Sequence, residues 1–69
     1  MIKRRKFLKI LAHDFGVKPS RHGKGSHEIF ERGKGWAVIH VCDEIPEGTM
    51  YAILDELKID KSEFKKRLK

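Results

Sequence analysis

The middle of the chain constrains the fold most, because two short runs with strand character flank a glycine-rich turn. His27 to Arg32 forms the first run, and residues 36–41 form a second run rich in aromatic and β-branched side chains. The Gly-Lys-Gly segment at residues 33–35 predicts a hairpin connection between them. Residues 17–21 are partly β-branched and punctuated by Pro19, which is typical of an edge strand. The sequence therefore predicts three antiparallel strands.

Alternation along these strands assigns their side chains to two faces. If Phe30 points toward the helices, then Ala37, Ile39 and Val41 do so as well. Because a sheet face with several apolar side chains suits coverage by another protein, we expect the opposite face to bind a partner. That face carries His27, Ile29, Trp36, Val38 and His40.

Apolar residues at helical spacing predict a helix before the strands, over residues 3–14, and Gly16 is placed to end it. The predicted buried stripe consists of Leu8, Leu11, Ala12 and Phe15. The opposite face is basic and carries Arg5, Lys6, Lys9 and His13.

Two further helices are expected after the strands. The first has Thr49 as its predicted N-cap and a stripe formed by Met50, Ile53, Leu54 and Leu57. A last short helix should run to about residue 67, because the sequence before it has a capping-box pair and a hydrophobic-staple pair. These pairs are Asp60 with Glu63 and Ile59 with Phe64.

Size and composition predict a single domain over residues 1–69. A chain of 69 residues, 39% of them apolar, can bury one core. Cys42 is its one cysteine, so no intramolecular disulfide can stabilise it, and we expect the reducing cytoplasm as its compartment. No segment approaches the ~20 apolar residues of a membrane span, so no membrane association is expected.

Charge is distributed unevenly along the chain. Residues 1–41 carry ten Lys and Arg against three Asp and Glu, residues 42–60 one against six, and residues 61–69 five against one. A basic region of this kind suits a phosphate backbone, since neutralised phosphates release counterions. A solvated surface that binds no ligand is the alternative interpretation.

His27 is the main candidate for catalysis. It follows a basic, glycine-containing loop and begins a strand, and imidazole is the side chain best suited to proton transfer near neutral pH. RNA carries its own nucleophile in the 2′-hydroxyl, so its cleavage needs a base, an acid and nearby cations but no metal. An isolated strand histidine is more often structural, so composition by itself leaves both interpretations open.

Two segments resemble the HicA family of toxins. Residues 25–30, GSHEIF, match the family's GSH-x-x-F signature, and residues 44–57, EIPEGTMYAILDEL, are similar to its segment in which a Pro-x-Gly-Thr turn opens a helix. The resemblance implies an α+β fold like double-stranded RNA-binding domains, with the order α-β-β-β-α. It also implies a metal-independent endoribonuclease that cleaves mRNA without a cofactor, with His27 as its histidine. His40 lies near a second family histidine, and its role stays open.

The resemblance further implies a HicB-type antitoxin that binds the toxin and masks its active site. On the chain itself, Lys24 is the candidate cation for the pentavalent phosphorus, between the backbone N–H groups of Gly23 and Gly25, although a solvated loop lysine is the alternative. Trp36 could stack on a base or contact a partner. The residues expected to bind RNA are Arg21, Lys24, Gly25, Ser26, Lys6 and Lys9, with Lys3 and Arg5 as further phosphate contacts.

The sequence is therefore compatible with three functions. The first is a ribonuclease toxin that uses His27 as general acid or base. The second is a non-catalytic RNA-binding module of the same fold, for which the basic helix and loop would be enough. The third is a protein-interaction domain without activity. No zinc site is expected, since the spacing of His22, His27, His40 and Cys42 matches no zinc-binding pattern.

Overall fold

The computed structural model describes residues 1–22 and 27–68, except for the side chains of residues 21 and 22. Strand β1 (Ile2–Lys3) leads directly into helix α1 (Arg4–Phe15). Three strands follow, β2 (Lys18–His22), β3 (His27–Arg32) and β4 (Gly35–His40). The chain then forms β5 (Glu44–Ile45), α2 (Glu47–Glu56) and α3 (Lys61–Lys66). This arrangement confirms the predicted α+β class and the α-β-β-β-α order with a short extra helix.

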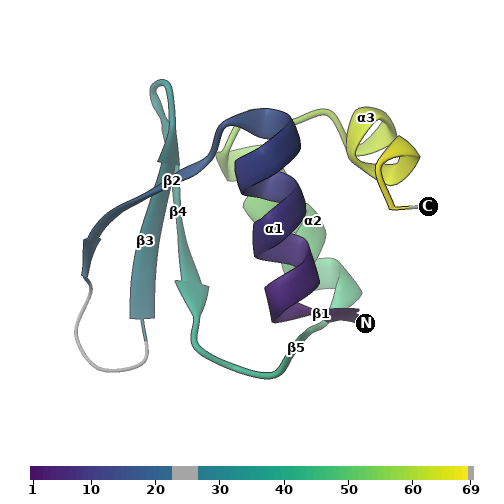
Figure 1. Cartoon of the computed structure of the whole chain (residues 1–69), viewed down its shortest axis with the longest axis horizontal. Coiled ribbons are helices and arrows are strands. Elements are labelled where there is room, and N and C mark those ends of the chain that lie inside the picture. Colours follow the sequence, from purple (N-terminus) through teal and green to yellow (C-terminus); the bar gives the residue numbers. More distant parts are fainter. Residues whose placement is uncertain (23–26, 69) are drawn as a thin grey trace.

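The sheet has the strand order β2-β3-β4 and is antiparallel throughout, with β2 at an edge as predicted. In Figure 1, α1 lies in front of α2, both helices are on the same side of the sheet, and α3 lies beyond them, away from the sheet. The short strands β1 and β5 pair with each other in a separate antiparallel ribbon. The sequence did not predict this ribbon, because two-residue strands carry no periodic signal.

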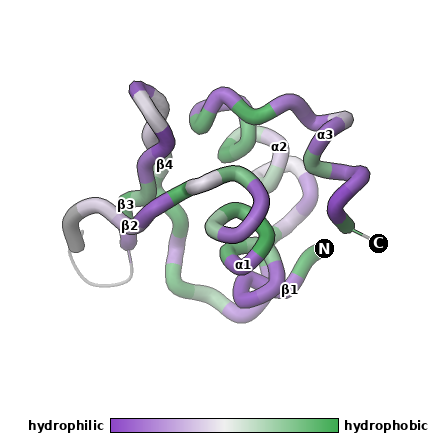
Figure 2. Tube along the Cα trace, turned by 45° about the horizontal axis from the view of Figure 1, so that its top comes forward, coloured by the Kyte–Doolittle hydropathy of each residue, from purple (hydrophilic) through white to green (hydrophobic). Residues whose placement is uncertain are grey.

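One hydrophobic cluster holds the layers together. Figure 2 shows hydrophobic segments where the helices face one another, and hydrophilic stretches along α3. Phe64 packs α3 against α1, since the centre of its ring lies 5.4 Å from the ring centre of Phe7 and 6.2 Å from that of Phe15. The buried members of the cluster are Phe7, Ile10, Leu11, Val17, Phe30, Ala37, Ile39, Ile45, Met50, Ile53, Leu54, Leu57, Ile59 and Phe64.

The predicted buried face of α1 was partly wrong. Phe7, Ile10 and Leu11 are the buried residues of the helix, whereas Ala12 is exposed. The predicted and the observed buried residues both have helical spacing. The helix is rotated about its axis relative to the prediction, so that the larger side chains of Phe7 and Ile10 reach the core. Gly16 ends the helix as predicted, with a φ of 67°, and the N–H of Val17 donates to the carbonyl of Leu11 at 3.0 Å.

Arg32 joins the sheet to the ends of both long helices. Its Nε donates to the carbonyl of Phe15 at 3.0 Å, and its Nη1 donates to the carbonyls of Leu57 at 3.2 Å and Lys58 at 2.9 Å. The last carbonyls of a helix have no partner within the helix and carry partial negative charge. A guanidinium donates several hydrogen bonds and carries a positive charge, so it satisfies these carbonyls and balances their partial negative charge. The Arg32 side chain therefore fixes the position of β3 relative to α1 and α2.

The ends of the C-terminal helices agree with prediction at α3 and differ at α2. Asp60 caps α3, since its carboxylate accepts a hydrogen bond from the N–H of Ser62 at 2.7 Å. Thr49 was predicted as the N-cap of α2, but it is the third residue of that helix, and Pro46 occupies the N-cap position in an extended conformation. None of the helices among the described residues is long and apolar enough to cross a bilayer.

Candidate active site

Two histidines meet at one end of the three-stranded sheet. His27 begins β3 and His40 ends β4, and antiparallel pairing places them opposite each other. Their ring centres lie 4.3 Å apart, and the ring planes are inclined by 73°. Both residues are exposed, so a ligand in solution can reach both imidazoles. The sequence had pointed to His27 and had left the role of His40 open.

The register of the hairpin brings this pair together. Residues 33 and 34 form its turn, and Gly33 supplies the left-handed conformation that the turn needs, with a φ of 58°. Pairing then runs from Arg32 opposite Gly35 to His27 opposite His40. Because side chains alternate between the faces, a slip by one residue would move one histidine to the face that the helices cover.

Arg4 holds the strand ends that carry the two histidines. Its Nε donates to the carbonyl oxygen of His40 at 2.7 Å, and its guanidinium forms an ion pair with the carboxylate of Glu28, the residue after His27. The Arg4 side chain is only 16% exposed. Sequence reasoning missed this contact, because Arg4 is 36 residues from His40 and begins a helix with no local sign of such a role.

Part of the predicted RNA-binding set lies outside the described residues. Lys24, Gly25 and Ser26 belong to the segment between β2 and β3, and Arg21 is described only in its backbone. The backbone places Arg21 in β2, next to the strand that His27 begins. These four residues therefore remain predictions.

The basic side chains of the first helix differ in their surroundings. Lys6 and Lys9 are exposed, as an RNA contact requires, although Lys6 Nζ also lies 3.5 Å from the carbonyl oxygen of Leu68. Lys3 instead forms ion pairs with Asp43 at 3.3 Å and Glu44 at 3.4 Å. The hydrogen bond and charge of Asp43, followed by those of Glu44, raise the pKa of Lys3 above its ordinary value. Lys3 is thus engaged by these two carboxylates.

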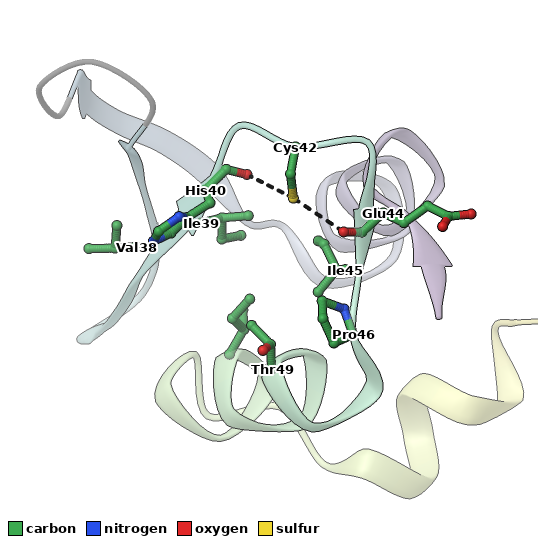
Figure 3. A pocket seen from close by; sticks show the side chains of 9 residues that line it. Val38, Ile39, His40, Cys42, Glu44, Ile45, Pro46 and Thr49 are labelled. Atoms are coloured by element: carbon green, nitrogen blue, oxygen red, sulfur yellow. Dashed lines mark hydrogen bonds between the residues drawn. The ribbon is translucent and has the colours of Figure 1, made fainter.

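A pocket of about 340 Å³ opens beside His40, between the end of β4 and the start of α2 (Figure 3). Ile45 and Pro46 form one wall of it, and Thr49 lies at its base in that view. The thiol of Cys42 donates to the carbonyl oxygens of Glu44 at 3.3 Å and His40 at 3.6 Å. The walls are mostly apolar, so the pocket suits an apolar or aromatic group next to the histidine pair.

The sheet face that carries the two histidines also exposes apolar side chains. Trp36 is 60% exposed and Val38 is 37% exposed, as the predicted division of faces requires. The division was wrong for Val41, which is 52% exposed because the strand ends at His40 and alternation no longer applies.

Among residues 1–22 and 27–68, no group of three or more His, Cys, Asp or Glu side chains is arranged to hold a metal ion.

Comparison with protein families gave a match over residues 4–59 to the family described as the HicA toxin of bacterial toxin-antitoxin. The matched region runs from the start of α1 through the sheet and α2, so it defines the class of protein as a toxin of a toxin–antitoxin system. The chain belongs to the HicA toxin family, which confirms the resemblance found in the sequence. Family membership implies an antitoxin as partner. Comparisons with curated proteins and with solved structures gave no match.

Proposed function

We propose that the chain is a metal-independent endoribonuclease toxin that cleaves mRNA in the cytoplasm, with His27 as a general acid or base. The observation that carries the proposal is the position of His27, which is exposed, lies at the end of the sheet and directly follows the basic, glycine-containing segment of the sequence. Exposure is the condition on which a nuclease role depends, since a buried ring could not reach a phosphodiester.

The proposed chemistry needs no group beyond the chain and the RNA. The 2′-hydroxyl attacks the adjacent phosphorus, and the bond to the 5′-oxygen breaks. Cations stabilise the charge that develops on the phosphorus oxygens. Lys24, with the backbone N–H groups of Gly23 and Gly25, is proposed for this task, and Gly25 and Ser26 are proposed to bind RNA. Arg21, Lys6 and Lys9 are proposed to hold the phosphate backbone, a role that sets affinity and salt dependence without reading sequence.

We further propose that the antitoxin is of the HicB type and covers the exposed sheet face. Trp36 and Val38 supply the apolar contact area on that face. His27 and His40 lie on the same face, so a protein bound there would block RNA from both imidazoles. A neighbouring reading frame of antitoxin size would support this partner.

The proposal predicts that His27→Ala abolishes toxicity and RNA cleavage. One general acid or base typically contributes about 10²- to 10⁴-fold to a rate, so purified variant protein should cleave RNA slower by that factor. The assay contains a chelator, so that contaminating metal-dependent nucleases are inactive. His13→Ala is the matched control, because His13 is an exposed histidine on α1 and does not belong to the strands that carry the histidine pair.

Two results would contradict the nuclease proposal. A toxic His27→Ala variant that cleaves RNA at the wild-type rate would remove the assigned role of His27. Salt-dependent RNA binding by wild-type protein without any cleavage would instead favour the non-catalytic RNA-binding module. Circular dichroism of each variant tests separately that the fold is intact.

A further inference from the structure

We propose that His40 is the second proton-transfer group of this active site and acts together with His27. The inference rests on the proposed ribonuclease function and names a residue that carries half of its proton chemistry. It starts from the contact between the two imidazoles, whose ring centres are 4.3 Å apart on the exposed face of the sheet.

Cleavage by the 2′-hydroxyl requires two proton transfers at one phosphodiester. One imidazole takes the proton from the 2′-hydroxyl as the oxygen forms its bond to phosphorus. The other imidazole gives a proton to the 5′-oxygen as its bond to phosphorus breaks. The products are a 2′,3′-cyclic phosphate and a free 5′-hydroxyl, and exchange with water returns both imidazoles to their starting protonation states.

The separation of the rings suits this division of work. A general acid or base must come within about 2.6–3.2 Å of the atom with which it exchanges a proton. Because the two rings are in contact, both can lie on one side of a bound phosphodiester, where one reaches the 2′-oxygen and the other the 5′-oxygen. A single histidine would have to serve both oxygens in turn.

The surroundings of His40 fix its backbone and leave its side chain exposed. Its carbonyl oxygen accepts hydrogen bonds from Arg4 Nε at 2.7 Å and from the thiol of Cys42 at 3.6 Å. Glu28, the carboxylate nearest in sequence to the pair, is engaged in an ion pair with Arg4. The end of β4 is therefore anchored from the helix side, which fixes the backbone that carries the imidazole before RNA binds.

The rival explanation is that His40 only supports the His27 ring by packing against it. The two roles differ in pH dependence and in chemical rescue. A proton-transfer group contributes one limb of a pH–rate profile, and removing it removes that limb. A packing residue lowers the rate at every pH and leaves both limbs in place.

The experiment compares wild-type protein with His40→Ala, His27→Ala and His13→Ala on a short RNA, with chelator present. We expect His40→Ala to lower the cleavage rate by about 10²- to 10⁴-fold, to lose one limb of the profile, and to recover activity when free imidazole is added. If His40 is the acid, a substrate with a 5′-thiolate leaving group also restores the rate, because that group leaves without a proton. His13→Ala should match wild type.

His40→Ala cleavage at the wild-type rate would overturn this inference alone, provided that His27→Ala is inactive. A slow His40→Ala variant with both limbs intact and no rescue by imidazole would also overturn it, in favour of packing. Wild-type protein that leaves RNA uncut would refute the nuclease proposal, and this inference with it. The three outcomes are thus distinguishable.

Discussion

Gly35 provides the sharpest test of how the sheet packs on the helices. This residue lies where β4 passes closest to the end of α2. A Cβ atom added at Gly35 would lie 2.6 Å from the carbonyl oxygen of Glu56 and 3.1 Å from the backbone of Leu57. Backbone atoms cannot rotate away as a side chain can, so Gly35→Ala must push the strand and the helix apart.

The expected loss of stability follows from two opposing contributions. Overpacking of this kind costs about 1–3 kcal/mol. Replacing glycine with alanine restricts the unfolded chain and returns about 0.4–1 kcal/mol. These contributions allow a net loss of roughly 0–2.6 kcal/mol, and for a contact with backbone atoms we expect Gly35→Ala to lower the free energy of unfolding by about 1–2 kcal/mol. In a domain of this size that corresponds to a fall in Tm of roughly 5–15 °C.

Gly48 offers a matched control for the same chemical change. It lies in the first turn of α2, and no atom lies within 4 Å of an added Cβ. Gly48→Ala should therefore stabilise the protein, by up to about 1 kcal/mol. Urea unfolding and thermal scans followed by far-UV circular dichroism measure both variants. The packing argument is refuted if Gly35→Ala is as stable as Gly48→Ala.

Two further predictions concern the helix ends. Arg32→Ala removes three hydrogen bonds to helix-terminal carbonyls and should lower the free energy of unfolding by about 2–4 kcal/mol. Urea denaturation measures this loss, and Arg32→Lys should have an intermediate stability. An unchanged unfolding midpoint for Arg32→Ala would show that water fully replaces the guanidinium. Lys58 has a φ of 62°, a left-handed conformation that is strained for any residue with a Cβ atom. Lys58→Gly should therefore raise the free energy of unfolding by about 0.5–1 kcal/mol. A lower Tm for this variant would show that the backbone at Lys58 is not strained.

The proposed active site and the proposed antitoxin contact share the exposed face of the sheet. The histidine pair lies at one end of β3 and β4, Val38 lies in the middle of β4, and Trp36 lies next to the hairpin turn at the other end. A partner that extends along β4 from Trp36 to His40 would cover the histidines, because all four side chains lie on the same side of two adjacent strands. Inhibition by an antitoxin would then require no conformational change in the toxin.

The sequence by itself determined the parts of this protein that local patterns encode. Alternation over His27 to Arg32 and the following run predicted β3, β4 and their two faces, because the side-chain period of a strand depends only on backbone geometry. Gly16 and Asp60 predicted helix ends for the same reason, since capping involves neighbouring residues. The family signature around His27 was also local.

The tertiary structure decided what depends on residues far apart in the chain. Arg4 reaches His40 across 36 positions, and Arg32 reaches the ends of two helices, contacts that no local pattern encodes. The choice of Phe7 and Ile10 over Ala12 for the core depended on which face of α1 meets the sheet and α3. His40 became the neighbour of His27 only through the register of the hairpin, because hydrogen bonding between strands fixes which residues stand opposite each other.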